Sequence, residues 1–127
     1  MNKIKVKQII MNNIKKSGWY SYPQLIRVLT AEGVQVNGTF QLEMKDKNII
    51  LWGGLSEEVV FAITELLEEG RLVGVPAPIE LYQMEGLDMT RRIILSVPQE
   101  RLETSAIWLT FLRYIPEANS HVVSLAQ

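Results

Sequence analysis

Five carboxylates gather between residues 56 and 69 of this sequence. The adjacent pairs Glu57-Glu58 and Glu68-Glu69 have the composition of an acid–base dyad or a cation site. Neighbouring residues on a helix point in different directions, however, so neither pair can share one proton or one ion. We therefore expect these carboxylates to act as surface charge, with no catalytic residues and no metal site.

The remaining side chains that could carry chemistry do not form a site either. His121 is the single histidine, and Glu117 is the acidic residue nearest to it in the sequence. A Ser/His/Asp arrangement would have to use His121, and no motif supports one. The absence of cysteine excludes disulfides, Cys zinc sites and thiol catalysis, and no P-loop or GxGxxG is present. These observations predict a non-catalytic protein with no cofactor.

A helix over residues 56–69 is expected to position the carboxylates. Ser56 suits the N-cap, negative charge suits the first turn, and Gly70 suits the position after the last turn. A helical wheel separates an inward apolar side from an outward acidic side. The inward side holds Val59, Ala62, Ile63 and Leu66. The outward side holds Phe61 with Glu57, Thr64, Glu65 and Glu68.

Phe61 is a large aromatic residue ringed by carboxylates, and it has two readings. If it is exposed, it forms a protein-docking patch together with Glu57, Glu65 and Glu68. Alternatively, a C-terminal helix or the segment over residues 40–52 packs over it, and Phe61 is then part of the core. The sequence leaves both readings open.

Residues 1–33 predict two helices around a short strand. A helix over residues 3–16 has one broad apolar face and ends in two lysines before Gly18. A second helix begins with the capping-box pattern Ser21-x-x-Gln24 and ends near Gly33. Trp19-Tyr20, between the helices, suits a strand. The apolar face of the first helix comprises Ile4, Val6, Ile10, Met11 and Ile14.

The segment after the second helix predicts a β-hairpin over about residues 38–53. Phe40, Leu42 and Met44 alternate with polar residues, and residues 49–52 form a continuous apolar run. After the acidic helix, residues 71–75 and 79–83 are predicted to pair as a second hairpin.

The C-terminal part is predicted to add a strand and a helix. The strand covers residues 91–97, and the helix covers residues 99–114 between two prolines. Residues 116–127 are expected to form a loose tail.

The sequence ITELLEEGRL, residues 63–72, resembles the L-x-x-L-x-x-x-G-x-L/I joint between the third helix and the wing of winged-helix proteins. The order helix, strand, helix, helix, hairpin over residues 3–85 is also similar to that superfamily. The resemblance implies an α+β, winged-helix-like single domain over residues 1–127. The hairpin over about 38–53 is then an insertion, and residues 87–115 are a C-terminal strand-helix extension.

Charge argues against the DNA-binding mode that the resemblance implies, in which the third helix enters the major groove. The helix over residues 56–69 has no Lys, Arg, Asn or Gln to read bases, and its carboxylates repel phosphate. Residues 1–50 hold eight Lys/Arg and three Asp/Glu, whereas residues 51–127 hold five and eleven. This split predicts complementary faces, either within the fold or between subunits.

The basic N-terminal half is the remaining candidate for nucleic-acid contact. Its candidate phosphate-binding residues are Lys5, Lys15, Lys16 and Arg27. Aromatic residues suited to base stacking, Trp19, Tyr20 and Tyr22, are interleaved with them. The other reading is that the lysines are a solvated helix face and the aromatics are core.

Two functional hypotheses follow. The first is a non-catalytic interaction or adaptor module that binds protein through its acidic helix around Phe61. The second is a homodimeric DNA-binding regulator that contacts phosphate through the basic N-terminal half. A homo-oligomer held by charge complementarity is compatible with either. A cytoplasmic location is expected, since no signal peptide and no apolar run long enough to span a membrane is present.

Overall fold

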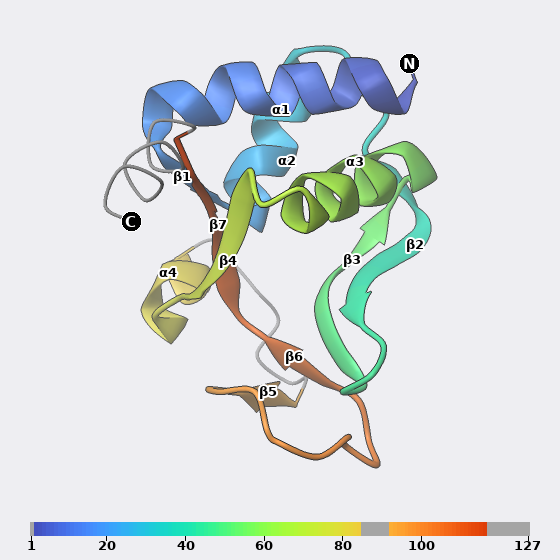
Figure 1. The fold of residues 1–127 in the computed structure, drawn as a ribbon, viewed down its shortest axis with the longest axis vertical. Coiled ribbons are helices and arrows are strands. Elements are labelled where there is room, and N and C mark those ends of the chain that lie inside the picture. The colour runs from blue at the N-terminus through green and yellow to red at the C-terminus, as the bar shows by residue number, and fades with distance from the viewer. Residues whose placement is uncertain (1, 85–91, 117–127) are drawn as a thin grey trace, which may run out of the picture.

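A computed structural model of the chain describes residues 2–84 and 92–116 and shows an α+β fold (Figure 1). The helices are α1 (Lys3–Ser17), α2 (Tyr22–Ala31), α3 (Glu57–Glu68) and α4 (Ile79–Met84). The strands are β1 (Trp19–Ser21), β2 (Asn37–Met44), β3 (Ile49–Leu55), β4 (Leu72–Pro76), β5 (Ile93–Ile94), β6 (Ala106–Trp108) and β7 (Thr110–Tyr114). The expected tail beyond Pro116, including His121, lies outside the described residues.

The helix boundaries of the first half follow from their capping residues. The side chain of Asn2 accepts a hydrogen bond of 2.9 Å from the Lys5 backbone N–H, and Gly18 ends α1 with a φ of 86° that favours glycine. Ser21 and Gln24 form the expected capping box at the start of α2, with hydrogen bonds of 3.3 Å and 3.0 Å. The predictions for α1, β1, α2 and the start of α3 are confirmed.

One residue on the predicted apolar face of α1 is not buried. Val6, Ile10 and Ile14 are fully buried as expected, but Ile4 is 65% exposed. Ile4 lines a shallow hollow beside Lys7 instead of reaching the core. Ile4 shares the apolar face on a helical wheel but is therefore not part of the core.

A three-stranded antiparallel sheet lies beside the helices, in the strand order β1-β7-β4. Leu112 of β7 is fully buried and is opposite Tyr20 on one side and Gly74 on the other. Along β7, Thr110 and Leu112 are buried whereas Arg113 is exposed, which is the alternation of a sheet with one covered face. The middle strand of this sheet therefore comes last in the sequence.

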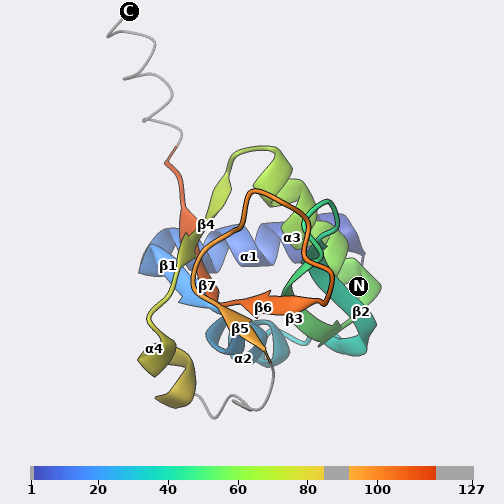
Figure 2. The same ribbon diagram turned by 90° about the horizontal axis from the view of Figure 1, so that it is seen from below.

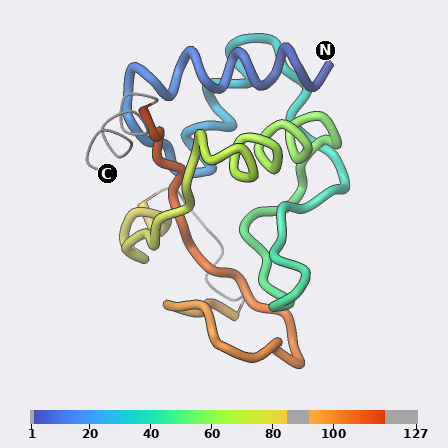
Figure 3. Tube along the Cα trace, in the orientation of Figure 1, coloured from blue at the N-terminus to red at the C-terminus, as the bar shows by residue number. Residues whose placement is uncertain are grey.

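The second sheet has the order β2-β3-β6-β5, with β2 antiparallel to β3 and the other pairs parallel (Figure 2). Residue Leu109 alone separates β6 from β7. A single stretch of chain thus belongs to both sheets, and Figure 3 shows it running from the second sheet up to the first.

An aromatic cluster of two buried tyrosines and a partly buried tryptophan connects α2, β3 and α4. The ring of Trp52 stacks on Tyr22 with centroids 5.8 Å apart and is 5.6 Å from the ring of Tyr82. The Tyr82 hydroxyl accepts a hydrogen bond of 3.2 Å from the Tyr22 backbone N–H and donates one to the Thr110 carbonyl. Because Tyr82 is fully buried, it fixes α4 against the core.

The predicted pairing of residues 71–75 with 79–83 is wrong. Residues Ile79–Met84 form α4, and β4 pairs with β7 instead. Pro78 lacks a backbone N–H, and its carbonyl accepts a hydrogen bond of 3.1 Å from the Leu81 N–H in the first turn of α4. The edge of β4 is thus occupied by a strand more than thirty residues later in the chain.

The predicted helix over residues 99–114 is also wrong, because its second half forms β6 and β7. The segment from Thr110 to Tyr114 is rich in the aromatic and β-branched residues that favour a half-buried strand. The preceding strand was predicted over 91–97 but covers only Ile93–Ile94, and residue 91 lies outside the described part.

Candidate functional site

Helix α3 has the two sides that the sequence predicted. Val59, Ala62, Ile63 and Leu66 are buried, whereas Glu57 and Glu68 are exposed. Phe61 is 47% exposed, and no C-terminal helix is present over residues 99–114 to cover it. The side chain of Ser56 caps the helix by accepting a hydrogen bond of 3.4 Å from the Val59 backbone N–H.

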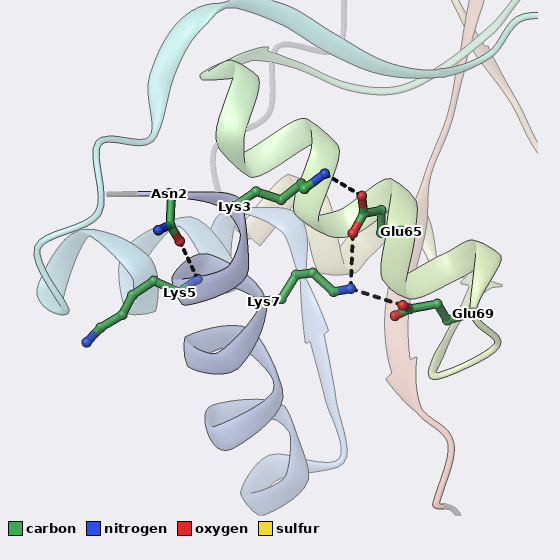
Figure 4. Close-up of polar contacts among 6 residues, drawn as sticks. All are labelled: Asn2, Lys3, Lys5, Lys7, Glu65 and Glu69. Carbon is green, nitrogen blue, oxygen red and sulfur yellow. Dashed lines mark hydrogen bonds and ion pairs between the residues drawn. The ribbon is translucent and has the colours of Figure 1, made fainter.

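Three ion pairs join the acidic helix to α1 (Figure 4). Glu65 is 2.6 Å from the ammonium of Lys3 and 3.0 Å from that of Lys7, and Lys7 is also 3.0 Å from Glu69. The hydrogen bonds that Glu65 accepts, first from Lys3 and second from Lys7, lower its pKa. The hydrogen bonds that Lys7 donates, first to Glu69 and second to Glu65, raise its pKa. The unequal charge of the two halves is therefore partly matched within the fold, and Glu65 faces α1 instead of an external partner.

Phe61 borders a groove of about 860 Å³ lined by residues of α3 and β2, two elements that contact each other (Figure 1). Phe40 of β2, which is 45% exposed, lines the same groove. We refer to this feature as the Phe40–Phe61 groove. Its lining from β2 and the following turn is Thr39, Phe40, Gln41, Glu43 and Lys45. Its lining from α3 is Val60, Phe61, Thr64 and Glu68.

Phe40 was not recognised as a site residue from the sequence. The alternation of Phe40, Leu42 and Met44 predicted that all three face inward, and Leu42 is indeed only 3% exposed. The register of β2 against β3 shifts between Phe40 and Leu42. Such an irregularity changes the side of the strand on which a residue lies, so Phe40 remains half exposed.

The basic candidates come from two helices, and Lys5 lies apart from the other two lysines. Lys5, Lys15, Lys16 and Arg27 are all exposed. Lys5 lies in the first turn of α1 and the other two lysines in the last, roughly 15 Å apart at the helical rise of 1.5 Å per residue. Arg27 belongs to α2 and lines a separate hollow with Trp19 and Tyr20.

One of the three candidate stacking aromatics is unavailable. Tyr22 is only 1% exposed, and burial raises the pKa of its hydroxyl. Its ring packs against Trp52 inside the molecule. Trp19, by contrast, is 41% exposed.

Other classes of site find no support in the part of the chain that the structure describes. Among residues 2–84 and 92–116, no three His, Cys, Asp or Glu side chains lie together in a way that could hold a metal ion. No helix within the same residues has the length and apolarity to cross a membrane.

Comparison with known proteins does not assign this chain to a family. No protein-family model matches this sequence, and neither a curated protein nor a solved structure matches it.

Proposed function

We propose that this chain is a non-catalytic protein-interaction module whose partner docks in the Phe40–Phe61 groove. The observation that carries the proposal is the presence of two half-exposed phenylalanines, from α3 and β2, in one groove. Aromatic side chains within a hollow edged by polar residues are the usual anchors of protein interfaces.

The charge of the groove specifies the chemistry of the partner. Two carboxylates, Glu43 and Glu68, and one ammonium, Lys45, line it, and Glu57 is exposed one turn before Phe61 on α3. An apolar side chain flanked by Lys or Arg would satisfy both the phenylalanines and this acidic surround. The proposed partner is therefore a different protein that presents such a basic, apolar-anchored segment.

The proposed fold type is winged-helix-like, and the strand pairing supports it. The order α1-β1-α2-α3-β4 is followed by a return strand, β7, that lies between β1 and β4. In this proposal, residues 77–109 replace the short wing loop, and β2 and β3 are inserted before α3. The use of α3 for protein contact is supported by its carboxylates and by the adjacent β2, both of which oppose entry into a DNA groove.

Site-specific cross-linking tests the location of the partner. A photoreactive residue at position 61 is expected to capture the partner in cells, and the same group at Leu95 serves as the control. Leu95 is 79% exposed and lies outside the groove. Equal capture from both positions would contradict the proposed site, and cross-links between two copies would identify a homodimer instead of a different partner.

The captured protein, once purified, allows the anchor residues to be tested by binding. Phe61→Asp and Phe40→Asp are each expected to raise Kd by about 30-fold or more, the minimum for an interface hot spot. Leu95→Asp should leave Kd unchanged. If Phe61→Asp unfolds the chain, as judged by circular dichroism, Phe61 is a core residue and the proposal fails.

A further inference from the structure

A second hollow, of about 390 Å³, lies where α1, β1 and α2 meet and shares no lining residue with the Phe40–Phe61 groove. We refer to it as the Trp19 pocket. Its lining residues are Ser17, Trp19, Tyr20, Gln24, Arg27 and Val28, none of which is acidic.

The indole of Trp19 is held in place on one side and open on another. Its ring contacts Phe111 with centroids 5.1 Å apart and planes tilted by 59°, yet the residue remains 41% exposed. An exposed aromatic ring that its neighbours hold still is suited to stacking against a planar ligand, because little side-chain freedom is lost on binding.

Basic residues of three elements, α1, α2 and β7, are exposed at or near the Trp19 pocket. Lys15 and Lys16 do not line the pocket, but they are exposed in the last turn of α1, which ends at the lining residue Ser17, and Lys15 also lines the hollow beside Lys7. Arg27 contributes from α2. Arg113 of β7 is exposed and directly opposite Trp19 in the sheet, so both side chains lie on the same face.

The two ends of α1 differ in how their lysines are used. Lys3 and Lys7 are paired with carboxylates of α3. No ion pair among the described residues involves Lys15 or Lys16. Within residues 2–84 and 92–116, the carboxylates of the second half thus pair with the N-terminal end of α1 and not with the lysines at its C-terminal end.

We propose that the Trp19 pocket binds single-stranded nucleic acid, with a base stacked on Trp19 and neighbouring phosphates at Lys15, Lys16, Arg27 and Arg113. A strand fits better than a free nucleotide because the basic groups extend beyond the hollow to the end of α1 and to β7. A strand fits better than a duplex because stacking on an exposed indole needs an unpaired base. This site is independent of the protein-docking groove.

Fluorescence anisotropy with a labelled single strand of about 15 nucleotides tests the proposal, at about 50 mM and about 200 mM salt. Binding that weakens at the higher salt is expected. Lys15→Glu with Lys16→Glu should weaken it further and reduce the slope of log Kd against log salt by about 1.4, since each lost single-strand phosphate contact removes about 0.7. Trp19→Ala should raise Kd by about tenfold or more through lost stacking.

The matched control is Lys5→Glu with Lys45→Glu, which changes the net charge equally at two exposed positions outside the pocket. This variant should retain most of the binding. Four results would overturn the proposal: no binding at low salt, equal loss in the control, no effect of Trp19→Ala in a folded protein, or preference for a duplex of the same sequence. Circular dichroism on every variant separates loss of binding from loss of fold.

Discussion

Replacing Tyr82 by Phe isolates the contribution of one buried hydroxyl to the fold. The ring stays in place, so contact with Trp52 is retained and little volume is lost. The hydroxyl is a partner of two buried backbone groups, the N–H of Tyr22 and the carbonyl of Thr110. Both lose this partner in Tyr82→Phe, and water cannot replace it because Tyr22 and Thr110 are each 1% exposed.

The magnitude follows from the cost of leaving buried polar groups without partners. Each such group costs about 1–3 kcal/mol, and the Tyr22 N–H lies at the start of α2, where the helix itself provides no acceptor. With two such groups, the free energy of unfolding should therefore fall by about 2–6 kcal/mol. This is a large share of the stability expected for a domain of this size.

Urea denaturation followed by tryptophan fluorescence measures this loss, and Trp52 lies beside the substituted ring. Tyr114→Phe is the matched control, because Tyr114 is half-buried and its hydroxyl has no hydrogen bond within the described residues. The control should change stability by less than about 0.5 kcal/mol. A loss below that value in Tyr82→Phe would refute the argument that α4 is held to the core by this hydroxyl.

Three further substitutions test local features. Gly38→Ala should destabilise the fold by about 1–3 kcal/mol in urea denaturation, because its Cβ would lie 2.5 Å from the Leu55 carbonyl oxygen; Gly53→Ala, with no contact nearer than 3.7 Å, should be tolerated. Ser56→Ala should cost about 1 kcal/mol through the lost cap of α3, and an unchanged urea midpoint would contradict this. In the folded protein the pKa of Glu65 lies below its ordinary value of 4.5. The stability that the charged Glu65 contributes is therefore present above pH 4.5, and it is lost as the pH falls through the lowered pKa of the folded state. Glu65→Gln should flatten the dependence of the urea midpoint on pH in that range, and an unchanged profile would show that the ion pairs with α1 are not formed.

Local chemistry determined which elements could be predicted. The caps at Ser21, Ser56 and Gly18 act within a few residues, so the sequence located α1, α2 and the start of α3 correctly. The strand register of Phe40 depends on a local irregularity opposite β3, and nothing in the alternating pattern indicates it. The sequence therefore singled out Phe61 as a candidate but did not indicate Phe40, which lines the same groove.

Long-range pairing explains the errors in the C-terminal half. Apolar residues are dense between Ala106 and Leu112, so both a helical and a strand period fit them. The choice depends on β1 and β4, which offer edges on both sides of β7 and lie far away in the sequence. The same pairing excludes residues 79–83 from the sheet, which leaves them to form α4 and bury Tyr82.

Because β7 is the last described strand to be synthesised, the first sheet can form only after most of the chain has been made. β1 and β4 have no sheet partner until residues Thr110–Tyr114 have been made, and β6 reaches β3 only a few residues earlier. Until then the nascent chain carries unpaired strand edges, which are prone to aggregate. Truncation before Thr110 should consequently remove both strand pairs of the first sheet, β1 with β7 and β4 with β7. Addition of β7 is therefore the step that completes folding, and the C-terminal segment is not a dispensable extension.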